Sequence, residues 1–182
     1  MITFRLADAL PSERLAELQP PPGKRDDAGR RERLERLMDA GHGACHLRNP
    51  RVARLVERAL WHFDGELYRL LAWVVMPNHV HTLVEPLAAS SLSRIMHAWK
   101  SFTAKEANSM LGLSGRFWQP EYFDRAIHDE RHWRSALEYV HENPVKAGLV
   151  GRCEEWPYSS AAREYLEPGA GETPSPPGPD AI

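Results

Sequence analysis

Apolar positions recur along this chain with two periods, one typical of strands and the other of helices. Residues 2–6 alternate as in a short strand. Seven apolar residues run from Leu70 to Met76, Pro77-Asn78 interrupts them, and strand-forming residues resume at His79. Since adjacent Pro and Asn mark the end of extended segments, the pattern predicts a strand over 66–75, a tight turn, and a second strand over 79–85.

Three long helices are predicted from the 3.6-residue period and from capping residues. The first starts at Asn49-Pro50, with proline at its first position, and ends at Asp64-Gly65. The second is capped by Ser90 or Ser91 and reaches about Leu111. The third is capped by Asp129 and is expected to stop at Pro144, because proline interrupts helical hydrogen bonding. Residues 30–38 are expected to form a shorter helix.

The order of these elements predicts an α+β fold. Residues 117–119 and 122–127 supply a further aromatic-rich strand and bend. Hairpin-linked strands alternating with helices indicate a ferredoxin-like split βαβ core, with a partly antiparallel sheet and helices packed on it. We expect one domain over residues 1–166, with residues 11–40 a charged, partly helical excursion. Residues 167–182, half of them Pro or Gly, are expected to be a disordered acidic tail.

Composition and charge are ordinary overall but uneven along the chain. The 182 residues are 42% hydrophobic and 26% charged, which is typical of a globular protein, and the apolar run is too short for a membrane span. Two widely separated cysteines, with no paired spacing, favour the reducing cytoplasm. The net charge is −2, yet residues 94–152 hold nine Lys/Arg against seven Asp/Glu, and residues 153–182 hold one against six. An acidic tail therefore masks a mildly basic body.

Two pairs of residues have a spacing that makes them candidates for metal binding or catalysis. His79 and His81 lie two apart in a predicted strand, so their side chains leave the same face and could hold a divalent metal ion. Tyr139 and Asn143 lie four apart in a predicted helix and share a face. Each pair also has a structural interpretation, as packed histidines and as a tyrosine at the edge of the core.

Other enzyme classes fit these residues less well. A histidine-triad nucleotide hydrolase would need a third alternating histidine where Leu83 stands. A zinc hydrolase would need a third strong ligand and a general base, and Glu85 is displaced along the strand from the histidine pair.

Four motifs occur together and in order. They are Trp73-Val-Val-Met-Pro-Asn-His-Val-His81, Phe117-Trp-Gln-Pro120, Glu138-Tyr-Val-His-Glu-Asn-Pro-Val-Lys-Ala-Gly148 and Trp156-Pro-Tyr-Ser-Ser160. This set resembles the REP-associated tyrosine transposases, relatives of the single-tyrosine transposases in the HUH nuclease superfamily. The resemblance covers residues 43–162.

The resemblance implies roles for the paired residues. His79 and His81 match histidines that bind Mg²⁺ or Mn²⁺, Tyr139 matches the nucleophile, and Asn143 matches the position of a third metal ligand, which is often Gln in the family. The implied reaction is metal-dependent cleavage and transfer of single-stranded DNA at a hairpin, through a 5′-phosphotyrosine. The alternative is a domesticated protein that binds hairpin DNA without cutting it.

Further residues are candidates for DNA contacts, either by stacking on bases or by neutralising phosphates, or else they have packing and surface roles. They are Lys100, Trp118, Gln119, Arg125 and Lys146. No membrane partner is expected, and both a homodimer and a monomer are compatible with the sequence.

Overall fold

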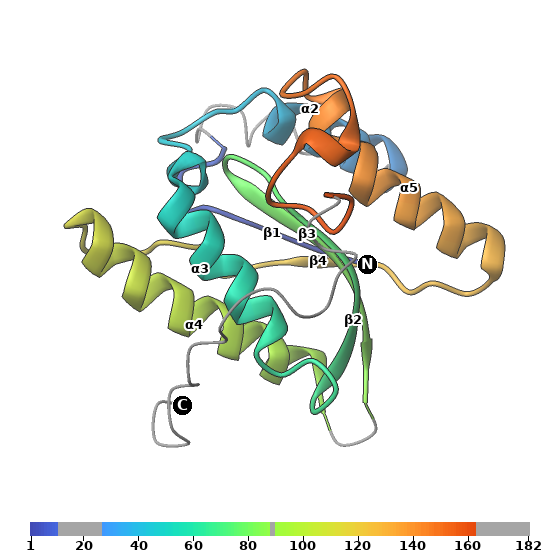
Figure 1. The fold of residues 1–182 in the computed structure, drawn as a ribbon, viewed down its shortest axis with the longest axis horizontal. Helices are drawn as coiled ribbons and strands as arrows, with labels where there is room; N and C mark the ends of the chain where they lie inside the picture. Colours follow the sequence, from blue (N-terminus) through green and yellow to red (C-terminus); the bar gives the residue numbers. More distant parts are fainter. Residues whose placement is uncertain (11–26, 88–89, 163–182) are drawn as a thin grey trace, which may run out of the picture.

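The computed structural model describes residues 1–10, 27–87 and 90–162 as an α+β structure (Figure 1). The predicted tail over 167–182 and the segment 11–26 lie outside these residues. The elements, in chain order, are β1 (Ile2–Arg5), α2 (Asp27–Asp39), η1 (His46–Arg48), α3 (Pro50–Trp61), β2 (Tyr68–Val75), β3 (His79–Pro86), α4 (Leu92–Leu111), β4 (Phe123–Asp124), α5 (Glu130–Lys146) and η2 (Cys153–Glu155).

The four strands form one sheet in the order β2-β3-β1-β4, and each neighbouring pair is antiparallel. β3 separates β1 from β2, and β1 separates β3 from β4, which is the arrangement of two interleaved split βαβ units. The predicted α+β, ferredoxin-like core is therefore confirmed. The hairpin between β2 and β3 is closed by a bond from Met76 N–H to the His79 carbonyl at 2.8 Å, as the Pro77-Asn78 turn predicted.

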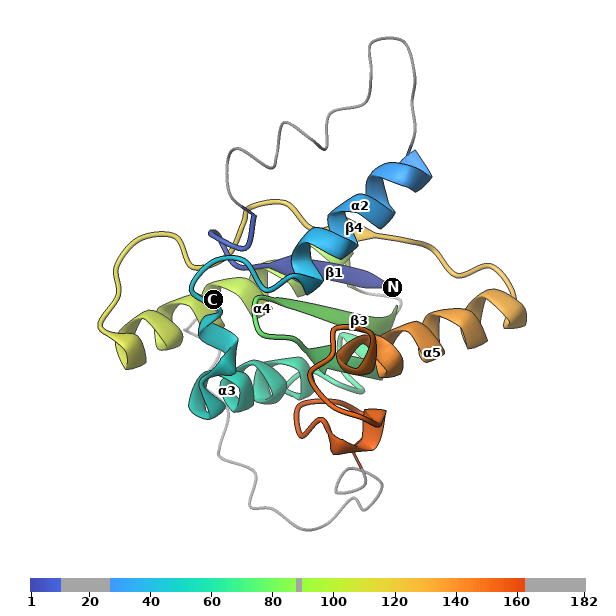
Figure 2. The ribbon, with the colours of Figure 1, turned by 90° about the horizontal axis from the view of Figure 1, so that it is seen from above.

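The two faces of the sheet have different partners (Figures 1 and 2). One face, with Phe4, Val75 and Val80, packs against α3 and α4 in the larger core. The other, with Val74 and Leu83, packs against Ala136 and Val140 of α5. Since alternate strand residues point to opposite faces, the odd-numbered residues of β1 and β3 lie on the α5 face.

Helix α5 corrects one sequence prediction, since it runs through Pro144 to Lys146. Proline removes one backbone donor but does not end this helix, and the end is set by Gly148, whose φ of 68° is left-handed. Leu149 N–H bonds to the Pro144 carbonyl and Gly148 N–H to the Val145 carbonyl, both at 2.9 Å. These two bonds form a Schellman motif. Asn143 is therefore held inside a complete helical turn.

The Trp156–Ser160 motif covers the free edge of β2. Val75 N–H bonds to the Tyr158 carbonyl at 2.8 Å, and Ser160 N–H bonds to the Trp73 carbonyl at 3.0 Å. The Trp156 indole also donates to the Val75 carbonyl at 3.0 Å. Pairing this edge satisfies backbone groups that would otherwise be open to another strand. Ser160 Oγ lies 2.9 Å from His141 Nε2, so the segment also ties β2 to α5.

Helix α2 confirms the short helix expected over 30–38, although it begins earlier. Leu34 and Met38 are buried and pack with Leu10, so this part of the charged excursion has an apolar contact with the domain. Its last residue, Asp39, lies next to β3. None of the helices in the described part of the chain is long and apolar enough to cross a membrane.

Glu57 supplies a prediction about stability. This α3 carboxylate is 6% exposed and accepts a 3.5 Å hydrogen bond from the Trp73 indole. Burial raises the pKa of Glu57 from 4.5 to about 7. As the pH rises, the unfolded chain loses this proton first, so the stability contribution falls between pH 4.5 and about 7.

Glu57→Gln should remove this pH dependence and raise the free energy of unfolding by about 3 kcal/mol above pH 7. Denaturant titrations at both ends of the interval test this, and equal pH dependence in both proteins would contradict it.

Candidate active site

The two histidines of β3 are the centre of the candidate site. His79 and His81 are fully or almost fully buried, on the sheet face that carries α5. Their Nε2 atoms are 3.0 Å apart. The strand period brings them together as the sequence predicted.

Each histidine has a second partner that orients its ring. His79 Nδ1 lies 2.7 Å from Asn78 Oδ1, an oxygen that only accepts, so Nδ1 carries the proton and Nε2 presents a lone pair. His81 Nδ1 lies 2.8 Å from the hydroxyl of Thr3 on β1. Such outer partners fix the tautomer and orientation of metal-binding histidines.

Both imidazoles are neutral at ordinary pH. Burial, and then the neighbouring His81, hold the pKa of His79 well below its usual value. Burial lowers the pKa of His81 to about 3. Because only neutral imidazole binds a metal ion, burial keeps both side chains in the binding form.

Asn143 completes this group from α5. Its Nδ2 is 3.4 Å from His81 Nε2, while its Oδ1 is buried and accepts no hydrogen bond from the described residues. The two ends of an amide are assigned from such contacts, and rotating the amide by half a turn would exchange them. A carbonyl oxygen would then face the histidine pair.

The donor set fits a divalent ion. Two ligands at right angles, with bonds of about 2.1 Å, lie roughly 3.0 Å apart, which is the separation of the two Nε2 atoms. Among the described residues no group of three or more His, Cys, Asp or Glu side chains is arranged to hold a metal ion. The Asn143 amide, 3.4 Å from His81 Nε2, is a candidate for a third protein ligand.

Three further polar residues lie around the site, and the sequence did not predict their positions there. Thr3 and Asn78 orient the histidines. Asp39 Oδ1 lies 3.8 Å from His79 Nε2, which adds negative charge beside the pair. Asn78 also donates to the Met38 carbonyl at 3.1 Å, so it ties the end of α2 to this site. No sequence period links these positions, because they come from three separate segments.

Tyr139 lies directly beside the histidines. Its ring packs edge-on against His81, with centroids 5.1 Å apart, and its hydroxyl oxygen is buried. Lys146 Nζ lies 5.4 Å from the centroid of the Tyr139 ring. The two imidazoles, the Asn143 amide, the Tyr139 phenol and the Lys146 ammonium group therefore lie close together within one chain.

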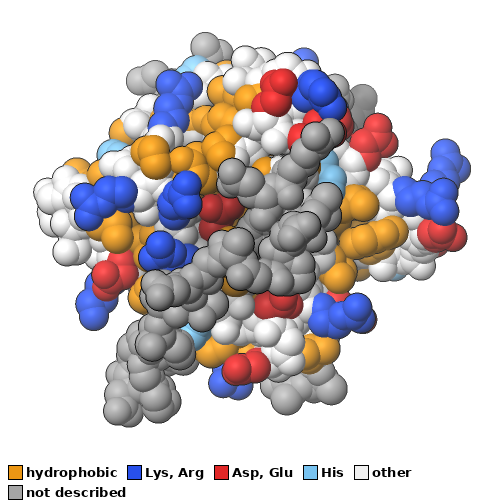
Figure 3. All heavy atoms as spheres, in the orientation of Figure 1, with side chains coloured by type: hydrophobic (Ala, Val, Ile, Leu, Met, Phe, Trp, Pro, Cys, Tyr) orange, Lys and Arg blue, Asp and Glu red, His pale blue; other side chains and the backbone are white. Residues whose placement is uncertain are grey.

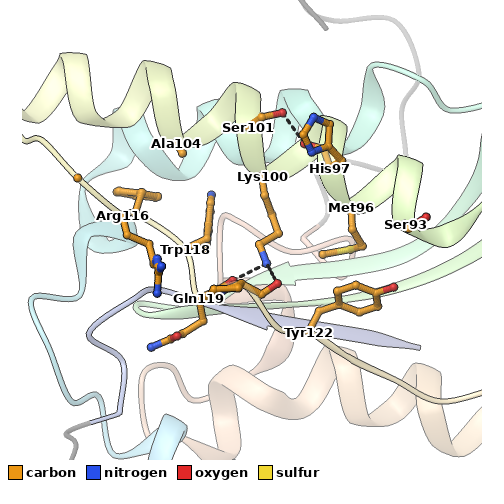
Figure 4. Close-up of a pocket in the computed structure, with 13 residues that line it drawn as sticks. Ser93, Met96, His97, Lys100, Ser101, Ala104, Arg116, Trp118, Gln119 and Tyr122 are labelled. Atoms are coloured by element: carbon orange, nitrogen blue, oxygen red, sulfur yellow. Dashed lines mark hydrogen bonds between the residues drawn. The ribbon is translucent and has the colours of Figure 1, made fainter.

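Three of the predicted DNA-contact residues lie elsewhere, around a cavity of about 440 Å³ between α4 and residues 115–122 (Figure 4). Lys100 donates to the carbonyls of Gln119 and, at 2.8 Å, Pro120. Gln119 donates to the Ala7 carbonyl at 2.6 Å. The Trp118 indole is 4% exposed and donates to Thr103 Oγ1 at 2.8 Å. These contacts give all three structural roles, and buried Trp118 offers no ring face for a base to stack on.

The chain belongs to the IS200-like transposase family, whose sequence model matches residues 49–143, just over half of the chain. The matched region contains the histidines, Tyr139 and Asn143.

Individual relatives are similar over part of their length. The REP-associated tyrosine transposase of Escherichia coli (strain K12) is 31% identical over 98 residues, which are 53% of this chain and 56% of that protein. A relative from Haemophilus influenzae is 27% identical over 107 residues and is 61% covered. This chain therefore spans less than two thirds of either protein.

A solved structure shares the fold. It is a REP-associated tyrosine transposase bound to a REP hairpin, with a TM-score of 0.53 and 21% identity. The alignment covers 96% of this chain and 86% of that chain. This likeness supports the antiparallel sheet with packed helices.

Proposed function

We propose that this protein cleaves and rejoins single-stranded DNA at a hairpin, with Tyr139 as the nucleophile. The observation that carries the proposal is the packing of Tyr139 against His81, with Asn143 one turn further along α5. Membership of the IS200-like transposase family supports the same reaction class. Each of these residues belongs to the same chain, so one protomer can perform the cut.

The proposed reaction is a transesterification. Tyr139 Oη attacks the scissile phosphorus, the phenol loses its proton, and the bond from phosphorus to the 3′ oxygen breaks. The released 3′ oxygen takes up a proton, and the 5′ phosphate stays attached to the tyrosine. Because one phosphodiester replaces another, the bond energy is kept for rejoining.

His79, His81 and Asn143 would hold Mg²⁺ or Mn²⁺ beside this phosphate. A divalent ion there supplies charge stabilisation to the phosphoryl oxygens. The protein's own residues orient the reaction: Thr3 and Asn78 fix the histidines, and the Schellman motif after Lys146 fixes the end of α5. Lys146 Nζ, 5.4 Å from the centroid of the phenol ring, provides a positive charge near it.

The proposed substrate is a hairpin rather than plain duplex. A whole-chain charge of −2 gives little nonspecific attraction to duplex DNA. The relative solved with a REP hairpin suggests this DNA shape. A protein that binds hairpins without cutting them remains the alternative, and it predicts binding with no covalent product.

A direct comparison of DNA shapes tests the substrate. A REP-like hairpin with unpaired flanks should be cut in the presence of Mg²⁺, and the same sequence annealed as a full duplex should be cut at least about tenfold more slowly, because its scissile strand is paired. Labelled oligonucleotides on denaturing gels give both rates. Equal rates would contradict hairpin selectivity, and binding without cleavage would favour the alternative.

A further inference from the structure

We propose that a groove along the first half of α5 holds the unpaired strand beside the scissile phosphate. The groove has a volume of about 450 Å³ and reaches Tyr139. Apart from Met1, its other lining residues come from the connection between β4 and α5 and from the first turns of α5. They include Arg125, His128, Arg131, His132 and Ser135.

The helical period explains why these residues share a surface with the nucleophile. His132, Ser135 and Tyr139 are spaced by three and four residues, so they form one stripe along α5. Asn143 continues this stripe by one more turn, into the histidine pair. A strand lying along the stripe would lead from the groove to the phosphate at Tyr139.

The lining of the groove carries more positive than negative side chains. Neither the Arg125 nor the Arg131 guanidinium makes a hydrogen bond or ion pair with a described residue, and both side chains are exposed. The only carboxylate in the lining is Asp129, which caps α5 by accepting the His132 backbone N–H at 2.7 Å. In Figure 3, Lys or Arg and Asp or Glu side chains lie next to one another at the end of the molecule where α5 begins. Free guanidinium groups at a groove suit phosphates.

Two histidines add groups that can meet bases or sugars. The rings of His128 and His132 have centroids 6.0 Å apart. His132 Nε2 is buried and makes no hydrogen bond to the described residues, so this nitrogen is available to hydrogen-bond a molecule in the groove. The groove's volume is in the range of pockets that enclose a molecule of nucleotide size. We therefore assign it to one unpaired strand rather than to a duplex.

This inference rests on the proposed function, and a binding experiment separates the two. The probes are a fluorescent short oligothymidylate and a hairpin that lacks unpaired flanks, titrated over a range of KCl concentrations. The double variant Arg125→Ala/Arg131→Ala should bind oligothymidylate about a hundredfold more weakly, at about tenfold for each lost charge-assisted contact. The slope of log affinity against log salt should shrink by about 1.4, for two phosphates on a single strand. Binding of the flank-free hairpin should stay close to that of the wild type.

Arg134→Ala is the matched control, because Arg134 is exposed on the same helix, is paired with Glu130 and does not line the groove. It should leave the slope unchanged, and Arg125→Lys/Arg131→Lys should recover most of the affinity. Cross-links from 5-iodouracil in the unpaired strand should map to residues 125–135. An unchanged oligothymidylate affinity in the alanine double variant, or equal loss for the flank-free hairpin, would overturn the groove assignment. Covalent attachment of the wild-type protein to a flanked hairpin is scored separately and tests the proposed function alone.

Discussion

Tyr139→Phe should lower the rate of DNA cleavage at least about a thousandfold, while hairpin binding is retained. The substitution removes only the oxygen that is proposed to attack phosphorus, so the reaction loses its nucleophile. The ring stays and keeps its edge-on contact with His81, at 5.1 Å between centroids. The fold should therefore survive, and the protein–DNA adduct should disappear from denaturing gels.

Tyr122→Phe is the matched control for this variant. Tyr122 lies beside the cavity between α4 and residues 115–122, away from the histidines. Loss of the Tyr122 hydroxyl should leave the cleavage rate and the amount of protein–DNA adduct unchanged. If Tyr139→Phe kept the adduct and Tyr122→Phe lost it, the nucleophile would be misassigned.

The second large effect is expected from the histidine pair. His79→Ala/His81→Ala should lower cleavage by about a hundredfold or more, because several kcal/mol of charge stabilisation at the phosphate would be lost with the metal ion. EDTA should have the same effect on the wild type, and Mg²⁺ or Mn²⁺ should restore it. The double variant should also lose Mn²⁺ binding, measured by calorimetry without DNA, which reports on the site independently of activity.

His62→Ala/His97→Ala provides the matched control, since neither residue contacts the site. It should bind Mn²⁺ and cut DNA as the wild type does. Far-ultraviolet circular dichroism checks that removing two buried side chains has not unfolded the protein.

Mixing folded His79→Ala/His81→Ala with Tyr139→Phe should not restore cleavage, because each nucleophile and its histidines belong to one chain. Undiminished Mn²⁺ binding and cleavage in the site variant would rule out the metal role.

Local periods in the sequence were enough to predict much of this site. The two-residue spacing of His79 and His81 implied a shared strand face, and the four-residue spacing of Tyr139 and Asn143 implied a shared helix face. The order of strands and helices also predicted the α+β core. What linked the two pairs was the resemblance to the transposases, since no period relates a residue on β3 to one on α5.

The remaining features depend on contacts between distant segments. Asp39 and Thr3 reach the histidines only because α2 and β1 lie beside β3. Trp118 was a plausible base-stacking residue by type, yet its position puts it in the core. Pro144 was expected to end α5, but the Schellman bonds at Gly148 determine that end. Residue type and spacing alone could not reveal these outcomes.

Peptide mapping of the covalent product shows directly whether Tyr139 is the nucleophile. After reaction with a flanked hairpin, the protein is digested with nuclease and trypsin, and the peptide carrying the remaining nucleotide is sequenced by mass spectrometry. We expect a single modified peptide, with the 5′ phosphate attached to the oxygen of Tyr139 and a free 3′ hydroxyl on the released DNA. Attachment to Tyr122 or Tyr158, or cleavage with no covalent peptide at all, would contradict it.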